Sequence, residues 1–496
     1  MAPLSETPSA SRTDRRYLIL CAWIAAIGAL LAAYGQTRAF AYDEGFHLLS
    51  AQLIAHGKLP YLDFFFPQAP WNAFWNAAWM SVFGESWRVT HAASAILTTA
   101  AVWLTADFVY VRADDQWRLT TAVTAAIAAG LNPLVLDFGT IAQAYGMCLF
   151  LAVASFRVSV VAVERRGLLL MTLAGFLSAA AACSSLLAAP VAPVLAIWTL
   201  WQNRAGNRLV KFIAFLAGAL VAAAPLIWLY LQGPRRVWFN LVDYHLHYRE
   251  VHWSGAWQQN LEVITSWMLS PAALTLGILA AAGVQFVCYR SGWPRGKRAE
   301  LYLCLWLIAA LALHLSRAAP TFERYYLLCV PFLAILAAFG LYSIASRLSR
   351  PSSQWRLAGV VVAVLTLSLA RRLYDERTDT AWPDYEAIAK KVEEVTPPGA
   401  KLLAEEQIYF LTRRVPPSGM EHHDAHKLET PIPGLSFAQL HILPQSQLDA
   451  MTRGGIFDTV EVCKDDGRID ELGLANLYRQ RADISDCSIF WERAPK

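Results

Sequence analysis

The feature that most constrains this chain is a series of long apolar runs along its first three quarters. A run of about 20 apolar residues is long enough to cross a lipid bilayer as an α-helix. Hydrophobic residues make up 56% of the 496 residues and charged residues only 16%, which excludes an ordinary soluble protein. We therefore predict an α-helical polytopic membrane protein with about 11 transmembrane helices, near residues 17–34, 89–111, 119–136, 143–163, 168–187, 189–201, 209–231, 263–288, 301–316, 325–345 and 356–371.

Two of these runs leave the count open. The run at 189–201 is short and contains Pro190 and Pro193, so it forms either a separate span or one arm of a re-entrant hairpin with 168–187. The first run is too long for the apolar core of a cleaved signal peptide, so we expect it to remain as a span.

The positions of Lys and Arg in the short loops predict the orientation. Basic residues concentrate on the cytoplasmic side of membrane proteins, which favours a cytoplasmic N-terminus here. Residues 1–16 are then a cytoplasmic tail, 17–371 a membrane domain, and 372–496 a module outside the cell inner membrane. The residues placed on the cytoplasmic side are Arg12, Arg15, Arg16, Arg112, Arg118, Arg165, Arg166, Arg204, Arg208, Lys211, Arg290, Arg295, Lys297, Arg298, Arg347, Arg350 and Arg356.

Residues 372–496 have the composition of a soluble module. A helix is predicted from Pro383 to about Val395, and strands at 401–404, 456–462 and 488–491, which together indicate an α/β fold. Cys463 and Cys487 are alone in this module, and an oxidising compartment would allow them to form a disulfide.

An acidic pair, Asp43 and Glu44, directly follows the first apolar run and opens a long external loop, 35–88. Ionisable groups at the membrane are costly and usually functional. The alternative is that the pair caps a short interfacial helix, since acidic residues favour a helix N-terminus. Asp63, further along the loop, lies among aromatic residues, and 71–83 is too short to span and predicts an interfacial helix.

The order of these segments resembles a known family. The acidic pair is followed by Gly57-Lys58-Leu59-Pro60-Tyr61-Leu62-Asp63-Phe64 and Pro67-Gln68-Ala69-Pro70, and later by Asp137 to Tyr145 and by Phe322-Glu323-Arg324-Tyr325-Tyr326-Leu327. Over residues 17–371 this resembles the GT-C fold glycosyltransferases that use polyprenyl-phosphate sugars. The most similar group is that of the protein O-mannosyltransferases and aminoarabinose transferases (glycosyltransferase family 39-like).

The resemblance implies a sugar donor on a polyprenyl phosphate, hexosyl or pentosyl, and a glycan, lipid or protein acceptor. Such a transfer needs a base for the acceptor hydroxyl and a cation for the departing phosphate. Asp43 matches the family's base, and Arg324 with Tyr325 matches its Arg-Tyr pattern. Glu44 is expected either to orient the acceptor or to cap the helix.

Further substrate-binding candidates follow from position. Asp137 matches a second family acid near the acceptor or a metal, or else it is a helix-terminal residue in water. Arg317 is placed at the same membrane face as Arg324. It either binds the phosphate or extends its charged group to the membrane interface, as long basic side chains do at the end of any span. Asp63 is the remaining candidate.

No cofactor is certain from the sequence, and a divalent metal is open. One possible ligand group is Asp243, His245, His247, Glu250 and His252, although substrate binding or an interfacial role is favoured for it. Residues 421–426 (Glu-His-His-Asp-Ala-His) are another, although a solvated loop is the favoured interpretation there. No Gly-rich phosphate loop of the GxxxxGK[ST] type occurs, and nothing indicates a nucleic-acid partner.

Two competing functions remain. A lipid-linked saccharide transporter or flippase would also need many spans, but no inverted hydropathy repeat occurs and the carboxylates gather at one membrane face and not at the midplane. A membrane receptor with a partner-binding tail leaves the acidic pair unexplained.

Overall fold

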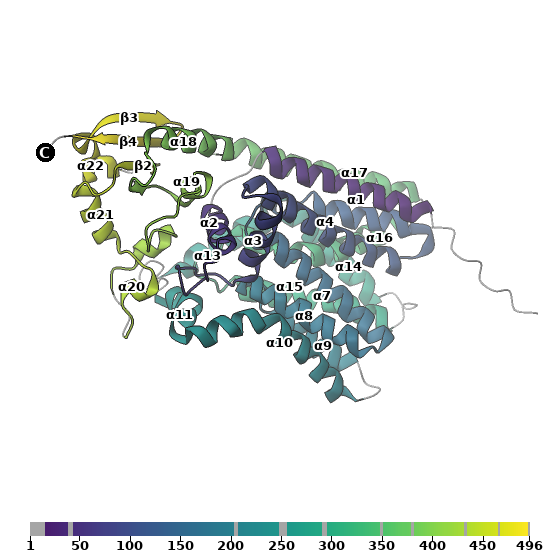
Figure 1. Ribbon diagram of the computed structural model, residues 1–496. Helices are drawn as coiled ribbons and strands as arrows, with labels where there is room; N and C mark the ends of the chain where they lie inside the picture. The colour runs from purple at the N-terminus through teal and green to yellow at the C-terminus, as the bar shows by residue number, and fades with distance from the viewer. Residues whose placement is uncertain are drawn as a thin grey trace, which may run out of the picture.

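A computed structural model describes residues 15–37, 43–202, 207–247, 255–289, 295–347, 351–377, 381–430, 434–464 and 467–494. Its main body is a bundle of helices, and the C-terminal module lies against one end of that bundle (Figure 1). The longer bundle helices are α1 (Arg15–Thr37), α4 (Trp87–Arg112), α7 (Tyr145–Arg165), α8 (Leu168–Ser184), α10 (Arg208–Gln232), α14 (Pro271–Tyr289), α15 (Arg295–Leu315), α16 (Val330–Arg347) and α17 (Pro351–Asp375).

Shorter helices complete the bundle and its outer end. They are α2 (Gly45–Ala55), α3 (Trp71–Phe83), η1 (Asp115–Trp117), α5 (Arg118–Gly130), α6 (Pro133–Phe138), η2 (Leu186–Ala188), α9 (Val191–Gln202), α11 (Pro234–Trp238), η3 (Phe239–Asp243), α13 (Ala256–Leu269) and η4 (Glu323–Cys329).

Within the described residues, seven helices are long and apolar enough to cross a membrane, and the pair α13–α14 makes an eighth if it is one broken span. The fold is that of a multi-pass membrane protein, as predicted, and helices cover every predicted run. The run at 263–288 is bent by 72° between α13 and α14. The break falls at Ser270 and Pro271 because a proline cannot donate to the helix and disfavours helical geometry in the residue before it.

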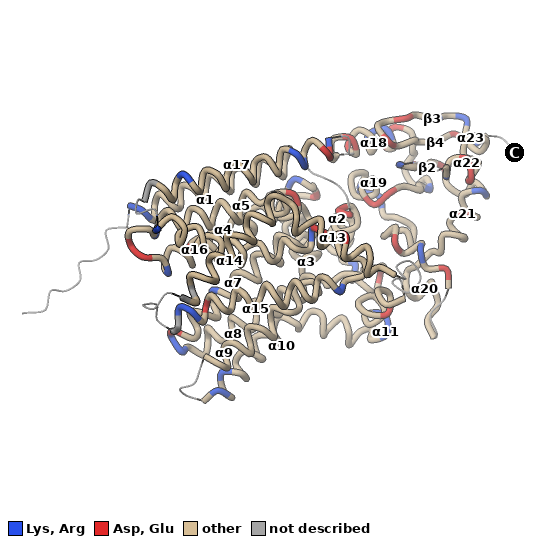
Figure 2. The backbone as a smooth tube through the Cα atoms, turned by 180° about the vertical axis from the view of Figure 1, so that it is seen from behind, with Lys and Arg blue, Asp and Glu red and all other residues tan. Residues whose placement is uncertain are grey.

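Charged residues gather at the two ends of the bundle and on the C-terminal module, and the middle of the bundle carries few (Figure 2). α1 begins at the end far from the module and runs toward it (Figure 1). At the far end, Arg112 pairs with Glu164 and Glu300. Such an arrangement keeps most charges out of the hydrocarbon layer, where they would be costly.

Close packing of helices in the bundle depends on glycine. A Cβ atom on Gly218 of α10 would come within 1.8 Å of the Thr172 carbonyl oxygen of α8, and one on Gly175 of α8 within 1.9 Å of the Phe215 oxygen of α10. The two backbones therefore touch directly, which is how small residues hold membrane helices together.

The C-terminal module contains a four-stranded sheet in the order β1-β2-β4-β3. β1 pairs with β2 in parallel, and the other pairs are antiparallel. Its elements are α18 (Trp382–Val395), β1 (Leu402–Leu403), α19 (Glu406–Leu411), η5 (His423–Lys427), α20 (Phe437–Leu440), α21 (Gln445–Arg453), β2 (Thr459–Cys463), α22 (Arg468–Leu472), α23 (Leu474–Leu477), β3 (Tyr478–Ile484) and β4 (Cys487–Arg493).

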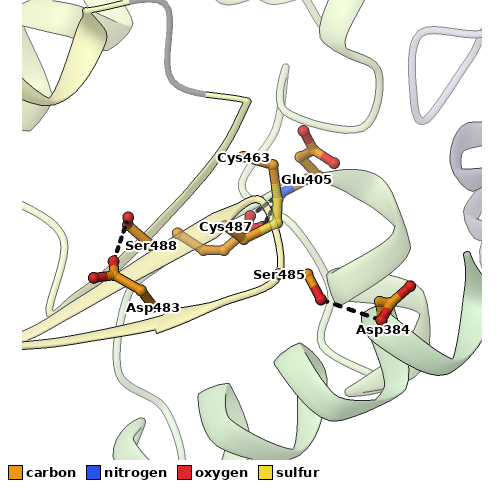
Figure 3. The surroundings of a disulfide bond; sticks show 8 residues. Asp384, Glu405, Cys463, Asp483, Ser485, Cys487 and Ser488 are labelled. Carbon is orange, nitrogen blue, oxygen red and sulfur yellow. Dashed lines mark hydrogen bonds between the residues drawn. A yellow bond between two sulfur atoms is a disulfide. The ribbon is translucent and has the colours of Figure 1, made fainter. Parts of the chain in front are cut away.

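Cys463 and Cys487 form the predicted disulfide. The two residues are direct partners in the antiparallel register of β2 and β4. The disulfide therefore links the last residue of β2 to the first residue of β4, the two central strands of the sheet (Figure 3). Nearby, Ser485 in the turn before β4 donates to Asp384 of α18 at 3.1 Å, which ties the helix to the sheet.

Candidate active site

Asp43 lies in the segment between α1 and α2, two residues before α2 begins. Its φ angle is 55°, in the left-handed region that Asp tolerates better than most residues. Its carboxylate accepts a hydrogen bond of 2.5 Å from the Nη2 group of Arg324. The structure therefore joins two residues that are 281 positions apart and that the sequence singled out separately.

Arg324 is held from several sides. It belongs to η4, the 3-10 segment that leads into α16. Its Nε donates to the Tyr145 hydroxyl at 3.1 Å, and its guanidinium lies over the Phe322 ring, 4.3 Å from the centroid. Tyr325 lies beside Tyr145, with ring centroids 6.5 Å apart. The Asp43 and Arg324 side chains remain 29% and 16% exposed, so a ligand can reach the pair.

Glu44 has different surroundings from its neighbour. It is fully buried, and its carboxylate accepts from Trp382 Nε1 at 2.8 Å and from the Ala142 backbone amide, and contacts His91 Nε2 at 2.6 Å. It makes no side-chain cap of α2. The interpretation of Glu44 as a side-chain cap is therefore wrong, because its carboxylate joins the segment before α2 to α4 and α18. Its role in orienting the acceptor stays a prediction.

Asp137 is buried near the C-terminal end of α6, where it forms an ion pair with Arg372 of α17 and accepts from Tyr34 of α1. Arg372 also lies 3.0 Å from Glu376 and 3.7 Å from Glu323, the residue before Arg324. The expectation that Asp137 lies in water is wrong. Sequence reasoning missed Arg372, although its position at the outer end of the last span was a usable signal.

Two other candidates lie apart from the pair. Asp63 is exposed, and its carboxylate accepts from the Leu59 backbone amide at 2.8 Å, so it closes the turn that follows α2. Arg317 is exposed in the turn after α15, and in the described part of the chain no hydrogen bond or ion pair joins it to Asp43 or Arg324.

The C-terminal module contributes histidines next to this site. His422 is 2% exposed and packs against Phe46 of α2, with ring centroids 4.1 Å apart. The favoured expectation of a solvated loop at 421–426 is therefore wrong. His47, also on α2, is buried, and burial together with the nearby His422 and Arg324 lowers the pKa of its imidazole to about 3. His47 is therefore neutral at pH 7.

His423 and Glu406 form a close ionic pair, with 2.9 Å between the imidazole Nδ1 and the carboxylate. Burial is the largest single influence on His423 and lowers its pKa, but the charge and hydrogen bond of Glu406, with the charges of Asp424 and Asp43, together outweigh burial and raise that pKa to about 9. In the other sequence-based histidine group, His245 bonds the Pro67 carbonyl and His247 the Thr430 hydroxyl, whereas Glu250 and His252 lie outside the described residues.

Comparison with solved structures decides the fold class. The crystal structure of ArnT from Cupriavidus metallidurans in the apo state superposes with a TM-score of 0.68 at 14% identity. The form of the same protein bound to undecaprenyl phosphate gives 0.66 at 15% identity. Each match covers 96% of this chain and 98% of the other. The chain has the GT-C fold.

The candidate site lies at the end of this GT-C bundle that faces the C-terminal module, since Glu44 accepts from Trp382 of α18 and His422 packs against Phe46 of α2. No protein-family model matches the sequence, and no curated protein matches it. The likeness is therefore one of three-dimensional structure, and it extends through both the GT-C bundle and the module.

Proposed function

We propose that this protein is a membrane glycosyltransferase that moves a sugar from a polyprenyl-phosphate donor to an acceptor hydroxyl. Asp43 is the general base that takes the proton of that hydroxyl. Arg324 holds the phosphate of the donor and stabilises it as it leaves. Attack from the face opposite the phosphate inverts the anomeric carbon, as in single-displacement glycosidases.

The observation that carries the proposal is the Asp43–Arg324 pair at 2.5 Å. Without a donor, the carboxylate is the partner of the guanidinium. A phosphate competes strongly with a carboxylate for an arginine, because its several charged oxygens can accept two parallel hydrogen bonds from the planar guanidinium. Donor binding would therefore draw Arg324 toward the phosphate and free Asp43 to accept a proton from the acceptor.

Further support comes from what surrounds the pair. The Nε group of Arg324 donates to the Tyr145 hydroxyl, which fixes the guanidinium in place. The two terminal nitrogens of that guanidinium can then bind an anion. Tyr325 is next to Tyr145, with ring centroids 6.5 Å apart, so it belongs to the same aromatic surroundings of Arg324. Asp137 neutralises Arg372 close to Glu323, so Arg324 remains the cation directed at Asp43.

The donor class rests on the comparison as well as on the site. A structural neighbour with nearly complete mutual coverage binds undecaprenyl phosphate. We propose a lipid-phosphate donor for this chain on that basis, used at the outer face of the cell inner membrane with the C-terminal module outside. The acceptor would be a glycan, lipid or protein hydroxyl.

Reconstituted protein distinguishes a transferase from a flippase. Proteoliposomes would receive a synthetic undecaprenyl-phosphate sugar and an extract of envelope lipids and glycans, and mass spectrometry would follow both donor and acceptors. A transferase releases undecaprenyl phosphate and adds one sugar mass to an acceptor. If the donor crosses the bilayer but stays chemically intact, the proposed function is wrong and the transporter alternative is right.

A further inference from the structure

Two segments of the C-terminal module bring three metal-binding side chains together beside the candidate active site. Glu406 begins α19, and His422 and His423 lie at the start of η5. One ligand atom from each of the three lies within 4.8 Å of the other two. Two imidazoles and one carboxylate are the ligand set of many zinc sites that keep a fourth position open.

The distances suit a small ion. The His423 Nδ1 and the Glu406 Oε1 are 2.9 Å apart. Two ligands bonded at about 2.0–2.1 Å to a tetrahedral zinc ion lie about 3.3 Å from each other, so an ion can enter between these atoms with a small side-chain movement. The ion would take the place of the proton that His423 shares with Glu406.

The surroundings of the cluster hold the ligands in place and leave one side open. Glu406 also accepts from the backbone amide of His423 at 2.5 Å, which fixes its carboxylate. The His422 ring is packed between Phe46 and Phe65, whose ring centroids are 4.1 and 5.6 Å away. The His423 side chain is 47% exposed, so a water molecule or a substrate oxygen can reach the ion.

We propose that Glu406, His422 and His423 form a binding site for one divalent transition-metal ion of the zinc class. The site faces the membrane domain, because His422 contacts Phe46 of α2. Imidazole ligands select zinc, cobalt or nickel over magnesium and calcium, which prefer sites made of oxygen alone. The site does not depend on the transferase assignment.

Metal binding is measured directly on the full-length protein in detergent, with its affinity tag removed and its metals stripped by a chelator. Titration with Co²⁺ followed by visible absorption, and with Zn²⁺ followed by calorimetry, should give one site per chain. The cobalt bands should lack a thiolate charge-transfer component, which excludes the cysteines as ligands. Mg²⁺ should not compete.

The matched variants are His423→Gln and His426→Gln. The His423 side chain is 47% exposed, so its replacement leaves the contacts of His422 with Phe46 and Phe65 in place. His426 belongs to the same short helix, but its ring bonds the Leu443 carbonyl at 2.6 Å and lies outside the cluster. We expect His423→Gln and Glu406→Gln to weaken Co²⁺ binding by at least about 100-fold and His426→Gln to leave it unchanged.

The proposal fails if the wild-type protein binds no stoichiometric Co²⁺ or Zn²⁺. It also fails if His423→Gln binds as tightly as the wild type. The thermal melting of His423→Gln, compared with that of the metal-free wild type, verifies that weaker binding reflects a lost ligand and not a misfolded module.

Discussion

At the scale of single residues, Asp43 and Glu44 are neighbours in the chain with different environments. Asp43 is partly exposed and paired with Arg324, whereas Glu44 is buried under Trp382. The sequence alone identified the acidic pair but could not show that one carboxylate is accessible and the other is buried. The division depends on Trp382, which is 338 residues away from Glu44.

Glu44→Gln should destabilise the protein. The glutamine has the same size, but its amide group presents a donor where the carboxylate accepts from Trp382 and from the Ala142 backbone amide. Mismatched buried hydrogen bonds to a charged group cost about 1.5–3 kcal/mol. A thermal melt in detergent should show the lower stability. Melting at the wild-type temperature would mean that this buried cluster contributes little.

Arg324→Ala should weaken the binding of undecaprenyl phosphate by about 10-fold to 100-fold, since charge-assisted hydrogen bonds contribute about 1.5–3 kcal/mol. Arg317→Ala is the matched control, because Arg317 is exposed and not joined to Asp43 by a hydrogen bond or ion pair in the described residues. Microscale thermophoresis with the purified variants measures both affinities. A larger loss for Arg317→Ala would move the phosphate site away from Arg324.

At the scale of elements, long periodic segments were the most predictable. The apolar runs correspond to helices because a segment of about 20 apolar residues in lipid has no water to bond its backbone N–H and C=O groups. A helix pairs these groups with one another inside the segment. The bend between α13 and α14 was not predicted, although Pro271 carries the signal. In the C-terminal module, the predicted strands were found, but β3 was missed because Arg479, Gln480 and Arg481 give it no apolar alternation.

Gly218→Val should disrupt the packing of α8 against α10. A Cβ at Gly218 would come within 1.8 Å of the Thr172 carbonyl, so the helices must separate and lose their contact. Gly277→Val in α14 is the control, because nothing lies within 4 Å of a Cβ there. Yields of folded protein by size-exclusion chromatography compare the two. Equal yields would contradict the close approach of the backbones.

At the scale of the whole molecule, the sequence led to the fold class and to most of the residues near the site, but not to their assembly. Asp43 and Arg324 were identified by separate local patterns. The contacts of His422 with α2 and of Arg372 with Asp137 join segments far apart in the chain. A single sequence contains no periodic signal for such contacts, because they depend on how the module docks on the bundle.

The orientation in the membrane is a prediction at this scale. The basic residues of the short loops favour a cytoplasmic N-terminus, which puts the module and Asp43 outside. Alkaline phosphatase fused after Lys496 should be active, and a reporter that works only in the cytoplasm should be inactive there. The opposite result would put the candidate site on the cytoplasmic side.

The central claim is that Asp43 acts as the general base of a sugar transfer. The decisive measurement is the turnover of purified Asp43→Asn with a synthetic undecaprenyl-phosphate sugar, beside wild type and with donor binding measured in the same preparation. The asparagine keeps the shape but removes the basicity, so turnover should fall by about 10²–10⁴-fold while donor binding persists. Wild-type turnover by Asp43→Asn would contradict the claim.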